Sequence, residues 1–307
     1  MSEINLRTTR LSGFFCNRLN IIYLFLLKKK KKTQFFIAMT ALFMSCPSFA
    51  ETATSTTTSN SSNADLKPLS GVRVSMQRML KSGEGRYFLS LYAGIPNPHA
   101  TLYDLMSVKE TLFSGTQKAD QITMKSLANE RDEAGKYQIS GTLNVNTGIF
   151  KVLLSENTET PAKSMQFEPA FKVANKPTFI FKFYGQNDPK QPLGNTLKRV
   201  DVINKVDNSV AQSLTGFTAY AGSMGYMDIN FDGYYDVILS DLSEGKKIVD
   251  KRYIYWMYNP KTNQFQRSAQ MEKIVGLPEL HGEKQQIDFG NGQVYQVEKG
   301  LLKRIGE

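Results

Sequence analysis

Apolar and polar residues alternate with period two through much of the chain, and this pattern predicts β-strands. Between residues 178 and 184, every second residue is phenylalanine. Within 86–92, Tyr87, Leu89 and Leu91 share one face by the same spacing. Such alternation is typical of strands that bury one face. Further segments with strand composition, each bounded by turn residues, are 198–204, 237–239, 251–258 and 264–267.

Two pairs of apolar segments predict β-hairpins. Residues 136–143 and 149–154 flank the turn sequence Asn-Val-Asn-Thr-Gly, and residues 293–297 and 301–305 flank Lys299-Gly300. By contrast, residues 119–135 are polar and predict a loop.

One segment, 102–113, is compatible with either a helix or a strand. Leu102, Leu105, Met106 and Leu112 have helical spacing, but β-branched and aromatic residues surround them. Elsewhere the sequence contains no long amphipathic helix, no coiled coil and no nucleotide-binding βαβ unit. We therefore predict an all-β chain of antiparallel sheets with few short helices. Its 307 residues allow one large domain or two small ones.

The N-terminal 50 residues predict a Sec signal peptide and hence a periplasmic or secreted protein. Lys28 to Lys32 form a positive segment, residues 35–44 are mostly apolar, and Ser48-Phe-Ala50 is a small-x-small cleavage site. The earlier apolar run 21–27 is shorter than the about 20 residues that span a bilayer. We therefore expect cleavage near Ala50 and no membrane span in the mature chain. A lipid anchor at Cys46 is an alternative.

Domain boundaries follow from composition. Residues 51–68 are rich in Ser, Thr and Asn and predict a disordered linker. We expect an N-terminal β-sheet region over 69–175 and a second β-domain over 176–307.

The net charge of +10 belongs mostly to the leader. Residues 1–50 hold eight of the 38 basic residues and one of the 28 acidic residues, which leaves 30 and 27 in the remainder, or +3. This balance does not favour nucleic acid as a partner. Both cysteines, Cys16 and Cys46, lie in the leader, so the mature chain folds without disulfides.

Oxygen-bearing side chains recur at positions 1, 3, 5 and 9 of the segment 228–236. They are Asp228, Asn230, Asp232 and Asp236, with glycine at position 6. This spacing turns hard oxygen ligands toward one point and suits Ca²⁺. The glycine permits the sharp turn around the ion.

The backbone carbonyl of Tyr234 is the expected ligand at position 7. The loop is not an EF-hand, because Leu239 occupies the position of the bidentate glutamate. Asp241 and Glu244 lie just beyond and are either further ligands or surface acids. A metal-free Asx-rich turn is the alternative interpretation of the whole segment.

Signatures of catalysis are sparse, so we expect a protein that is not an enzyme. The two histidines, His99 and His281, have no helical i, i+4 partner, and no Gly-x-Ser-x-Gly motif occurs. Glu156, Glu168 and Asp201 are nominal candidates for a glycosidase pair, but solvated surface charge is the favoured interpretation of each.

Aromatic residues gather around the candidate calcium loop. Tyr226, Tyr235, Tyr255 and Trp256 could bind a protein partner or a sugar if they were exposed. The alternative is that they are half-buried sheet residues, since alternation places Tyr255 and Trp256 on opposite faces of one strand.

The sequence resembles a group of bacterial periplasmic calcium-binding proteins related to the type i lysozyme inhibitors. The resemblance is carried by Asp-x-Asn-Phe-Asp-Gly-Tyr-x-Asp at 228–236, by Tyr-Ile-Tyr-Trp-Met-Tyr-Asn-Pro-Lys-Thr-Asn-Gln-Phe at 253–265 and by the closing segment 300–305. Residues 141–156 match more loosely. The loop is also similar to the DxNxDGxxD calcium turn of FG-GAP repeats in integrin-type propellers.

This resemblance implies sheets of broken or partial β-propeller type and a calcium loop at 228–236. It also implies inhibition by protein–protein contact, because the group includes immunity proteins that neutralise peptidoglycan hydrolases. We therefore expect an inhibitor or immunity protein against such a hydrolase. The alternatives are a calcium-dependent adhesin or glycan-binding envelope protein, a hydrolase with an unrecognised carboxylate pair, and a structural envelope protein.

Overall fold

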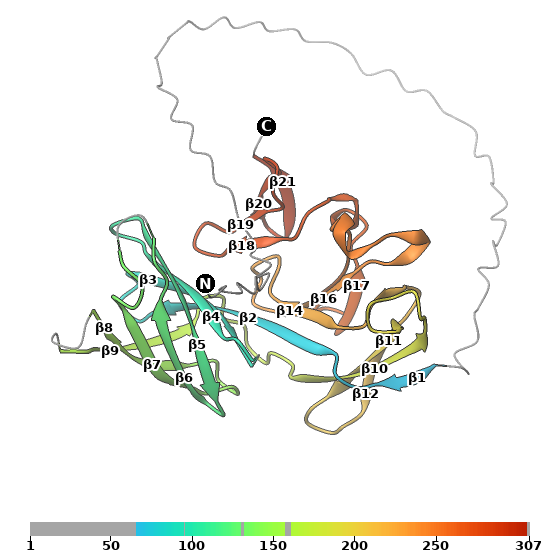
Figure 1. Cartoon of the computed structure of the whole chain (residues 1–307), viewed down its shortest axis with the longest axis horizontal. Coiled ribbons are helices and arrows are strands. Elements are labelled where there is room, and N and C mark those ends of the chain that lie inside the picture. Colours follow the sequence, from blue (N-terminus) through green and yellow to red (C-terminus); the bar gives the residue numbers. More distant parts are fainter. Residues whose placement is uncertain (1–65, 95, 130–131, 157–160, 306–307) are drawn as a thin grey trace, which may run out of the picture. The chain divides into compact units, whose positions relative to one another are not determined.

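The computed structural model describes residues 66–94, 96–129, 132–156 and 161–305, which Figure 1 shows as coloured ribbon. The predicted leader, with Cys16 and Cys46, and residues 51–65 of the predicted linker lie outside these ranges. By their contacts, the described residues belong to one compact unit. The described chain is all-β, as the alternation predicts, and its sheets are antiparallel apart from one parallel strand pair. Helical structure in these ranges is limited to the 3₁₀ turns η2 (Ser243–Gly245), η3 (Ile248–Asp250) and η4 (Met271–Lys273).

In the described ranges, no helix has the length and apolar character needed to span a membrane.

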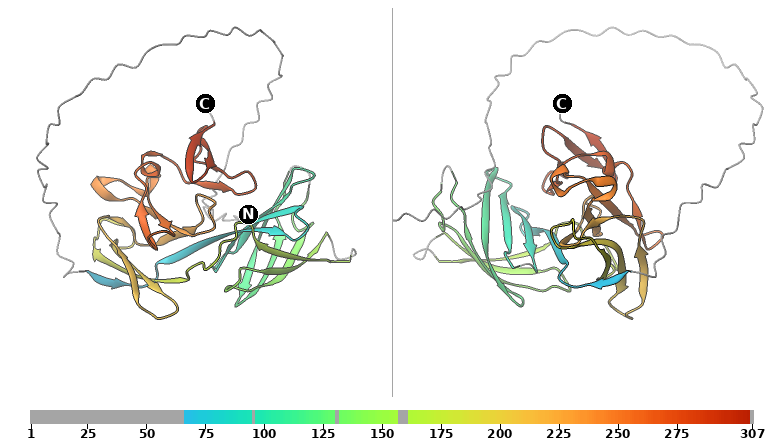
Figure 2. Two further views of the ribbon diagram at one scale, coloured as in Figure 1. Left: turned by 180° about the vertical axis from the view of Figure 1, so that it is seen from behind. Right: turned by 45° about the vertical axis from the view of Figure 1, so that its right-hand side comes forward.

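Eight antiparallel strands close into a barrel, because the last of them pairs back with the first. Alternate residues point inward and fill the barrel, with Leu89 and Phe113 almost completely buried. Figures 1 and 2 show these strands, cyan to yellow-green, grouped around a common axis. The strands are β2 (Arg73–Ser82), β3 (Tyr87–Ala93), β4 (His99–Asp104), β5 (Lys109–Lys118), β6 (Gln121–Ser126), β7 (Gln138–Leu143), β8 (Phe150–Ser155) and β9 (Lys163–Pro169).

The structure corrects two expectations and decides one open alternative. The broken propeller that the resemblance implies is replaced by the barrel. The loop predicted over 119–135 contains β6, whose Ile122 and Met124 face the barrel interior although the residues around them are polar. The helix allowed over 102–113 does not form, because this segment pairs as β4 and β5 on either side of a turn.

Four further strands of the same sheet extend from the barrel through β2. The first residues of β2 pair in parallel with β14, from Arg73 with Ser223 to Met76 with Tyr226, and the later residues of β2 pair with β3. Strand β2 therefore belongs both to the barrel and to this extension. The other strands follow in the order of their pairing: β14 (Ser223–Met227), β15 (Asp236–Ser240), β16 (Tyr253–Asn259) and β17 (Gln264–Arg267).

Two smaller sheets complete the fold, and each packs on one face of the extension. The first, with its core around Val200 and Leu239, consists of β1 (Lys67–Leu69), β10 (Phe179–Asn187), β11 (Asn195–Asn204), β12 (Val210–Leu214) and β13 (Ala219–Tyr220). The second, with its core around Tyr255 and Ile287, consists of β18 (Glu279–His281), β19 (Gln286–Asp288), β20 (Val294–Glu298) and β21 (Leu301–Arg304). Residues 67 and 68 of the predicted linker 51–68 belong to strand β1.

Candidate functional site

The predicted calcium loop runs from the end of β14 to the start of β15 and packs against the segment that leaves the barrel. The ring of Phe231 lies 5.5 Å from that of Phe171. Gly233 has φ of +92°, and a Cβ atom at this position would lie 2.7 Å from Cγ1 of Val173. Glycine therefore satisfies both the backbone conformation and the close packing of the turn.

Two buried aspartates organise the loop through backbone N–H groups. Asp228 is 3% exposed and accepts hydrogen bonds from the N–H of Asp232 at 3.0 Å and of Gly233 at 2.8 Å. Asp236 is fully buried and accepts from the N–H of Ile229 at 2.9 Å and of Tyr258 at 2.8 Å. The hydrogen bond from Tyr258 connects the loop to β16.

The other predicted ligands lie between these two aspartates and are half-buried. The amide of Asn230 donates to Oδ2 of Asp232 at 2.9 Å, and Oδ1 of Asp232 accepts from the N–H of Tyr234 at 2.9 Å. The ring of Tyr234 packs 5.3 Å from that of Tyr258.

The electrostatics of the loop reflect buried negative charge. Burial and the nearby Asp232 carboxylate raise the pKa of Asp228 to about 7. Burial also raises the pKa of Asp236 well above its usual range, against the effect of its two N–H donors. No basic side chain in the described ranges forms an ion pair with Asp228, Asp232 or Asp236. The nearest compensation comes from Lys176, whose ammonium is attracted by all three carboxylates, while burial of that ammonium lowers its pKa to about 8.

The loop can hold a cation only after some of its side chains turn. As arranged, no three His, Cys, Asp or Glu side chains of the described residues form a metal-binding group. Each carboxylate oxygen has two lone pairs, however, so an oxygen that accepts one N–H bond can still bind a cation. Asn230 and Asp232 bond each other and would have to turn toward the ion. The donor set, all hard oxygen with two buried carboxylates, therefore fits Ca²⁺.

The remaining acidic candidates have partners elsewhere. Asp241 accepts from Ser243 and pairs with Lys246 at 3.0 Å, and Glu244 is exposed. The nominal catalytic acids have three different partners: Glu156 with Lys136, Glu168 with Lys172, and Asp201 with Arg199.

The two histidines lie in different sheets. His99 is exposed on β4 and stacks on Tyr92 at 4.6 Å. His281, at the end of β18, has its Nδ1 atom 3.5 Å from the carboxylate of Glu283.

The four aromatic candidates do not form one exposed surface. Tyr255 is fully buried in the core beneath β18–β21, whereas half-buried Trp256 faces the opposite core, beside the guanidinium of Arg267. Tyr226 is buried and meets Tyr235 edge to face at 5.1 Å. These last two line a pocket.

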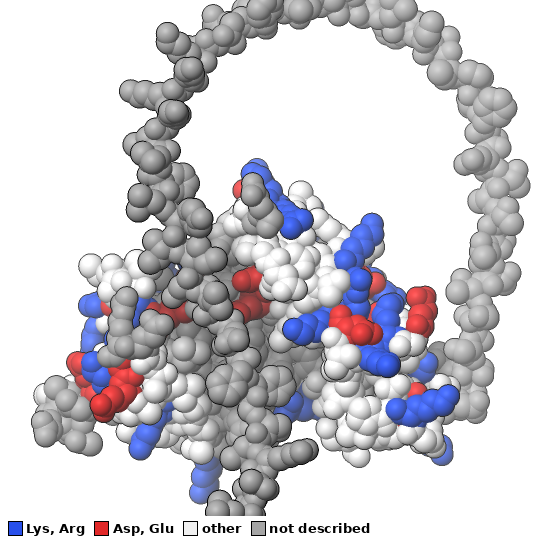
Figure 3. All heavy atoms as spheres, turned by 45° about the horizontal axis from the view of Figure 1, so that its top comes forward, with Lys and Arg blue, Asp and Glu red and all other residues white. Residues whose placement is uncertain are grey.

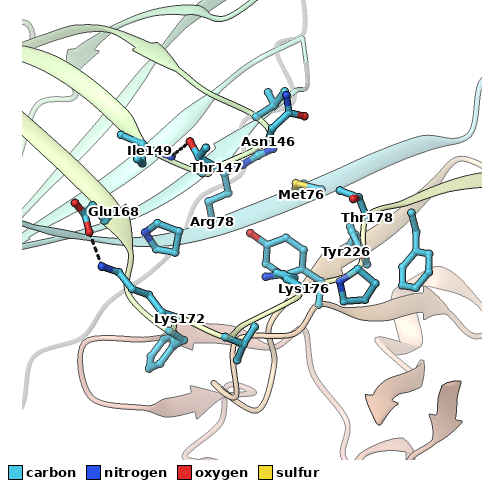
Figure 4. Close-up of a pocket in the computed structure, with 18 residues that line it drawn as sticks. Met76, Arg78, Asn146, Thr147, Ile149, Glu168, Lys172, Lys176, Thr178 and Tyr226 are labelled. Carbon is cyan, nitrogen blue, oxygen red and sulfur yellow. Dashed lines mark hydrogen bonds and ion pairs between the residues drawn. The ribbon is translucent and has the colours of Figure 1, made fainter. Parts of the chain in front are cut away.

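The pocket, shown in Figure 4, has a volume of about 540 Å³. Its walls are β2, the turn between β7 and β8, the end of β9, the connection 171–179, and the two tyrosines. Its charged residues are Arg78, Lys176 and the ion pair of Glu168 with Lys172. The sequence analysis identifies neither Arg78 nor Lys176. No local signal marks them, because the pocket joins segments that are distant in the chain.

On the face shown in Figure 3, basic and acidic side chains are interspersed over the described surface, in keeping with the small net charge of the chain beyond its leader. The chain matches no protein-family model, and no curated protein is similar enough to count as a relative. The resemblance to the calcium-binding inhibitor group therefore stays a hypothesis carried by the motifs alone.

Proposed function

We propose that the protein binds one Ca²⁺ at 228–236 and acts by binding another protein, without catalysing a reaction. The main support for a bound metal is the burial of the carboxylates. Asp228 and Asp236 are 3% and 0% exposed, Asp232 lies beside them, and none of the three has an ion-pair partner in the described ranges. Buried like charges are costly unless a counter-charge compensates them. A divalent cation held by these oxygens supplies that charge.

The ion has a structural role in this proposal. It fixes the turn between β14 and β15, and through Phe231 and Gly233 it fixes the barrel exit at Phe171 and Val173. The binding surface is then presented on a rigid set of sheets.

The partner we propose is a peptidoglycan hydrolase, which the protein inhibits as an immunity protein would. The support is the resemblance of the segments 228–236 and 253–265 to the lysozyme-inhibitor group and the predicted export signal. The mature chain of a cell-envelope inhibitor would meet such hydrolases in the periplasm.

The test is a clearing assay of purified peptidoglycan by lysozyme-type hydrolases, with and without the protein. We expect inhibition in calcium and weaker inhibition by Asp232→Ala, while Asp241→Asn, an acid outside the loop, retains full inhibition. If no hydrolase of a broad panel is bound or inhibited, the inhibitor role is wrong. Clearing of peptidoglycan by the protein alone would contradict the non-catalytic mechanism.

A further inference from the structure

The pocket between β2 and the connection 171–179 contains a buried cation without a counter-charge. Arg78 is 9% exposed, and its Nη1 atom is buried with no hydrogen-bond partner among the described residues. It projects from the same face of β2 as Met76, toward the turn that carries Asn146 and Thr147 (Figure 4). No ion pair engages Arg78 in the part of the chain that the structure describes.

A second cation enters from the opposite wall. Lys176 as a whole residue is exposed, but its ammonium lies 3.3 Å from the centroid of the Tyr235 ring. The acidic residue of the lining, Glu168, is already paired with Lys172. Two positive groups therefore face the cavity from different segments, and the carboxylate nearby is engaged elsewhere.

The state of Arg78 is energetically unusual. A guanidinium stays charged in proteins, and a buried donor left unpaired costs the full desolvation of that group. Arg199 differs from Arg78 in having a counter-charge: its Nε also lacks a hydrogen bond within the described residues, but it lies 3.2 Å from Asp201, and its guanidinium lies over Tyr184 at 3.9 Å. An oxyanion in the pocket would give Arg78 both a counter-charge and a hydrogen-bond acceptor.

The rest of the lining is apolar and aromatic. Met76, Pro169, Phe179 and Tyr226 contribute to it, and the volume of about 540 Å³ falls in the range of small-molecule sites. This combination suits a ligand with an anionic head and an apolar body.

We infer that this pocket binds a small organic molecule that carries a carboxylate or a phosphate on an apolar body. The oxyanion meets Nη1 of Arg78 and the ammonium of Lys176, and the body lies against Tyr226 and Phe179. The inference does not depend on the calcium loop or on the identity of a protein partner.

The experiment is calorimetric titration of the full chain with benzoate, phenyl phosphate and the neutral analogue benzamide. We expect at least one anion to bind, and benzamide to bind tenfold more weakly or worse. Acetate and inorganic phosphate measure how much of the affinity comes from the anionic group alone. Whether benzoate or phenyl phosphate binds more tightly shows whether the pocket prefers a carboxylate or a phosphate.

Variants locate the binding in the pocket. Arg78→Met and Lys176→Met should each weaken the anion about tenfold or more, the usual effect of losing a charged hydrogen bond. Arg199→Met, which removes a half-buried arginine outside the pocket, should leave the affinity unchanged. The inference is overturned if benzamide binds as well as the anions or if Lys176→Met keeps full affinity. If Arg78→Met does not fold, Lys176→Met and the neutral analogue still decide the question.

Discussion

Gly233 combines a left-handed backbone with a close approach to the barrel exit. Its φ is +92°, and an added methyl group would lie 2.7 Å from Val173 and 3.0 Å from the carbonyl oxygen of Phe171. Because glycine has only a hydrogen atom in place of a side chain, the turn of the candidate calcium loop can pack directly against the segment that leaves β9. The consequence can be measured by substitution.

Gly233→Ala should lower the free energy of unfolding by about 2–4 kcal/mol, because the backbone cost and the steric cost add. The measurement is urea denaturation without calcium. Gly194→Ala is the matched control, since Gly194 has φ of +66° and nothing within 4 Å of the added atom. The control should cost only about 1–2 kcal/mol. Equal losses in the two variants would show that the contact with Val173 is unimportant.

His281 lies beside a carboxylate that is itself buried. The side chain of Glu283 is 4% exposed, and within the described part of the chain its oxygens have no hydrogen-bond partners. Glu283 raises the pKa of His281. Glu279 also raises this pKa, and Lys284 lowers it. A histidine whose pKa is raised by folding stabilises the fold when it is protonated.

The stabilisation should be complete below the ordinary histidine pKa of about 6.5 and should be lost as pH rises through the raised value. Thermal melts from pH 5.5 to 9 measure this loss, which Glu283→Gln should reduce. His99→Gln serves as control, because His99 is exposed on β4. A wild-type pH dependence that Glu283→Gln leaves unchanged would exclude the pair as its source.

Among the elements, β2 connects the two halves of the described fold. It pairs with β14 at one end and closes the barrel with β3 and β9 at the other. Residues Gln77 to Leu80 are buried on both faces. Leu80 belongs to the barrel interior, whereas Met79 belongs to the core beneath β18–β21.

Leu80→Ala should destabilise the protein by about 2–5 kcal/mol, because it leaves a cavity where the barrel closes. Leu112→Ala is the control, since Leu112 on β5 is 47% exposed and should cost little. Denaturant unfolding measures both variants. A loss for Leu80→Ala no larger than that of the control would mean that β2 is not the closing strand.

The same elements show what sequence could predict. Strands β10 and β16 and the hairpin of β7 and β8 carry local signals, alternation and turn residues, so the sequence indicates them near their observed bounds. The sequence does not indicate strand β2, because its central residues are buried on both faces and apolar and polar residues therefore do not alternate along it. Strand β6 was missed because it is short and lies in a polar stretch.

The candidate functional residues likewise divide into those that the sequence indicates and those that only the structure reveals. The loop 228–236 is contiguous, so its spacing alone indicates a cation. The pocket depends on Arg78 and Lys176, which tertiary structure brings together from distant segments. No local pattern marks either residue, and the burial of Tyr226 and Tyr255 also depends on tertiary packing.

At the scale of the whole molecule, Lys176 links the loop to the pocket. Its ammonium lies over Tyr235 in the pocket and is attracted by Asp228, Asp232 and Asp236. A cation in the loop would compensate those carboxylates and leave the charge of Lys176 to a ligand. Calcium and the anion should therefore strengthen each other's binding.

Saturating calcium should tighten binding of the anionic probe by about fivefold or more, within the usual range of such coupling. Calorimetric titration of the probe with and without calcium measures this effect. Lys176→Met should bind the probe weakly and to the same extent in both conditions. Identical wild-type affinities with and without calcium would show that the two sites are independent.

Calcium titration by calorimetry, combined with thermal melts, tests the central claim most directly. The comparison is between the wild-type protein, Asp232→Ala, and Asp241→Asn as an acidic control outside the loop. The account predicts one Ca²⁺ per chain for the wild type and the control, with stabilisation of about 2.7 kcal/mol at free calcium about one hundred times Kd. Asp232→Ala should neither bind nor gain stability. If the wild type binds no calcium, the segment 228–236 is a metal-free turn held by its N–H bonds, and the proposed metal is wrong.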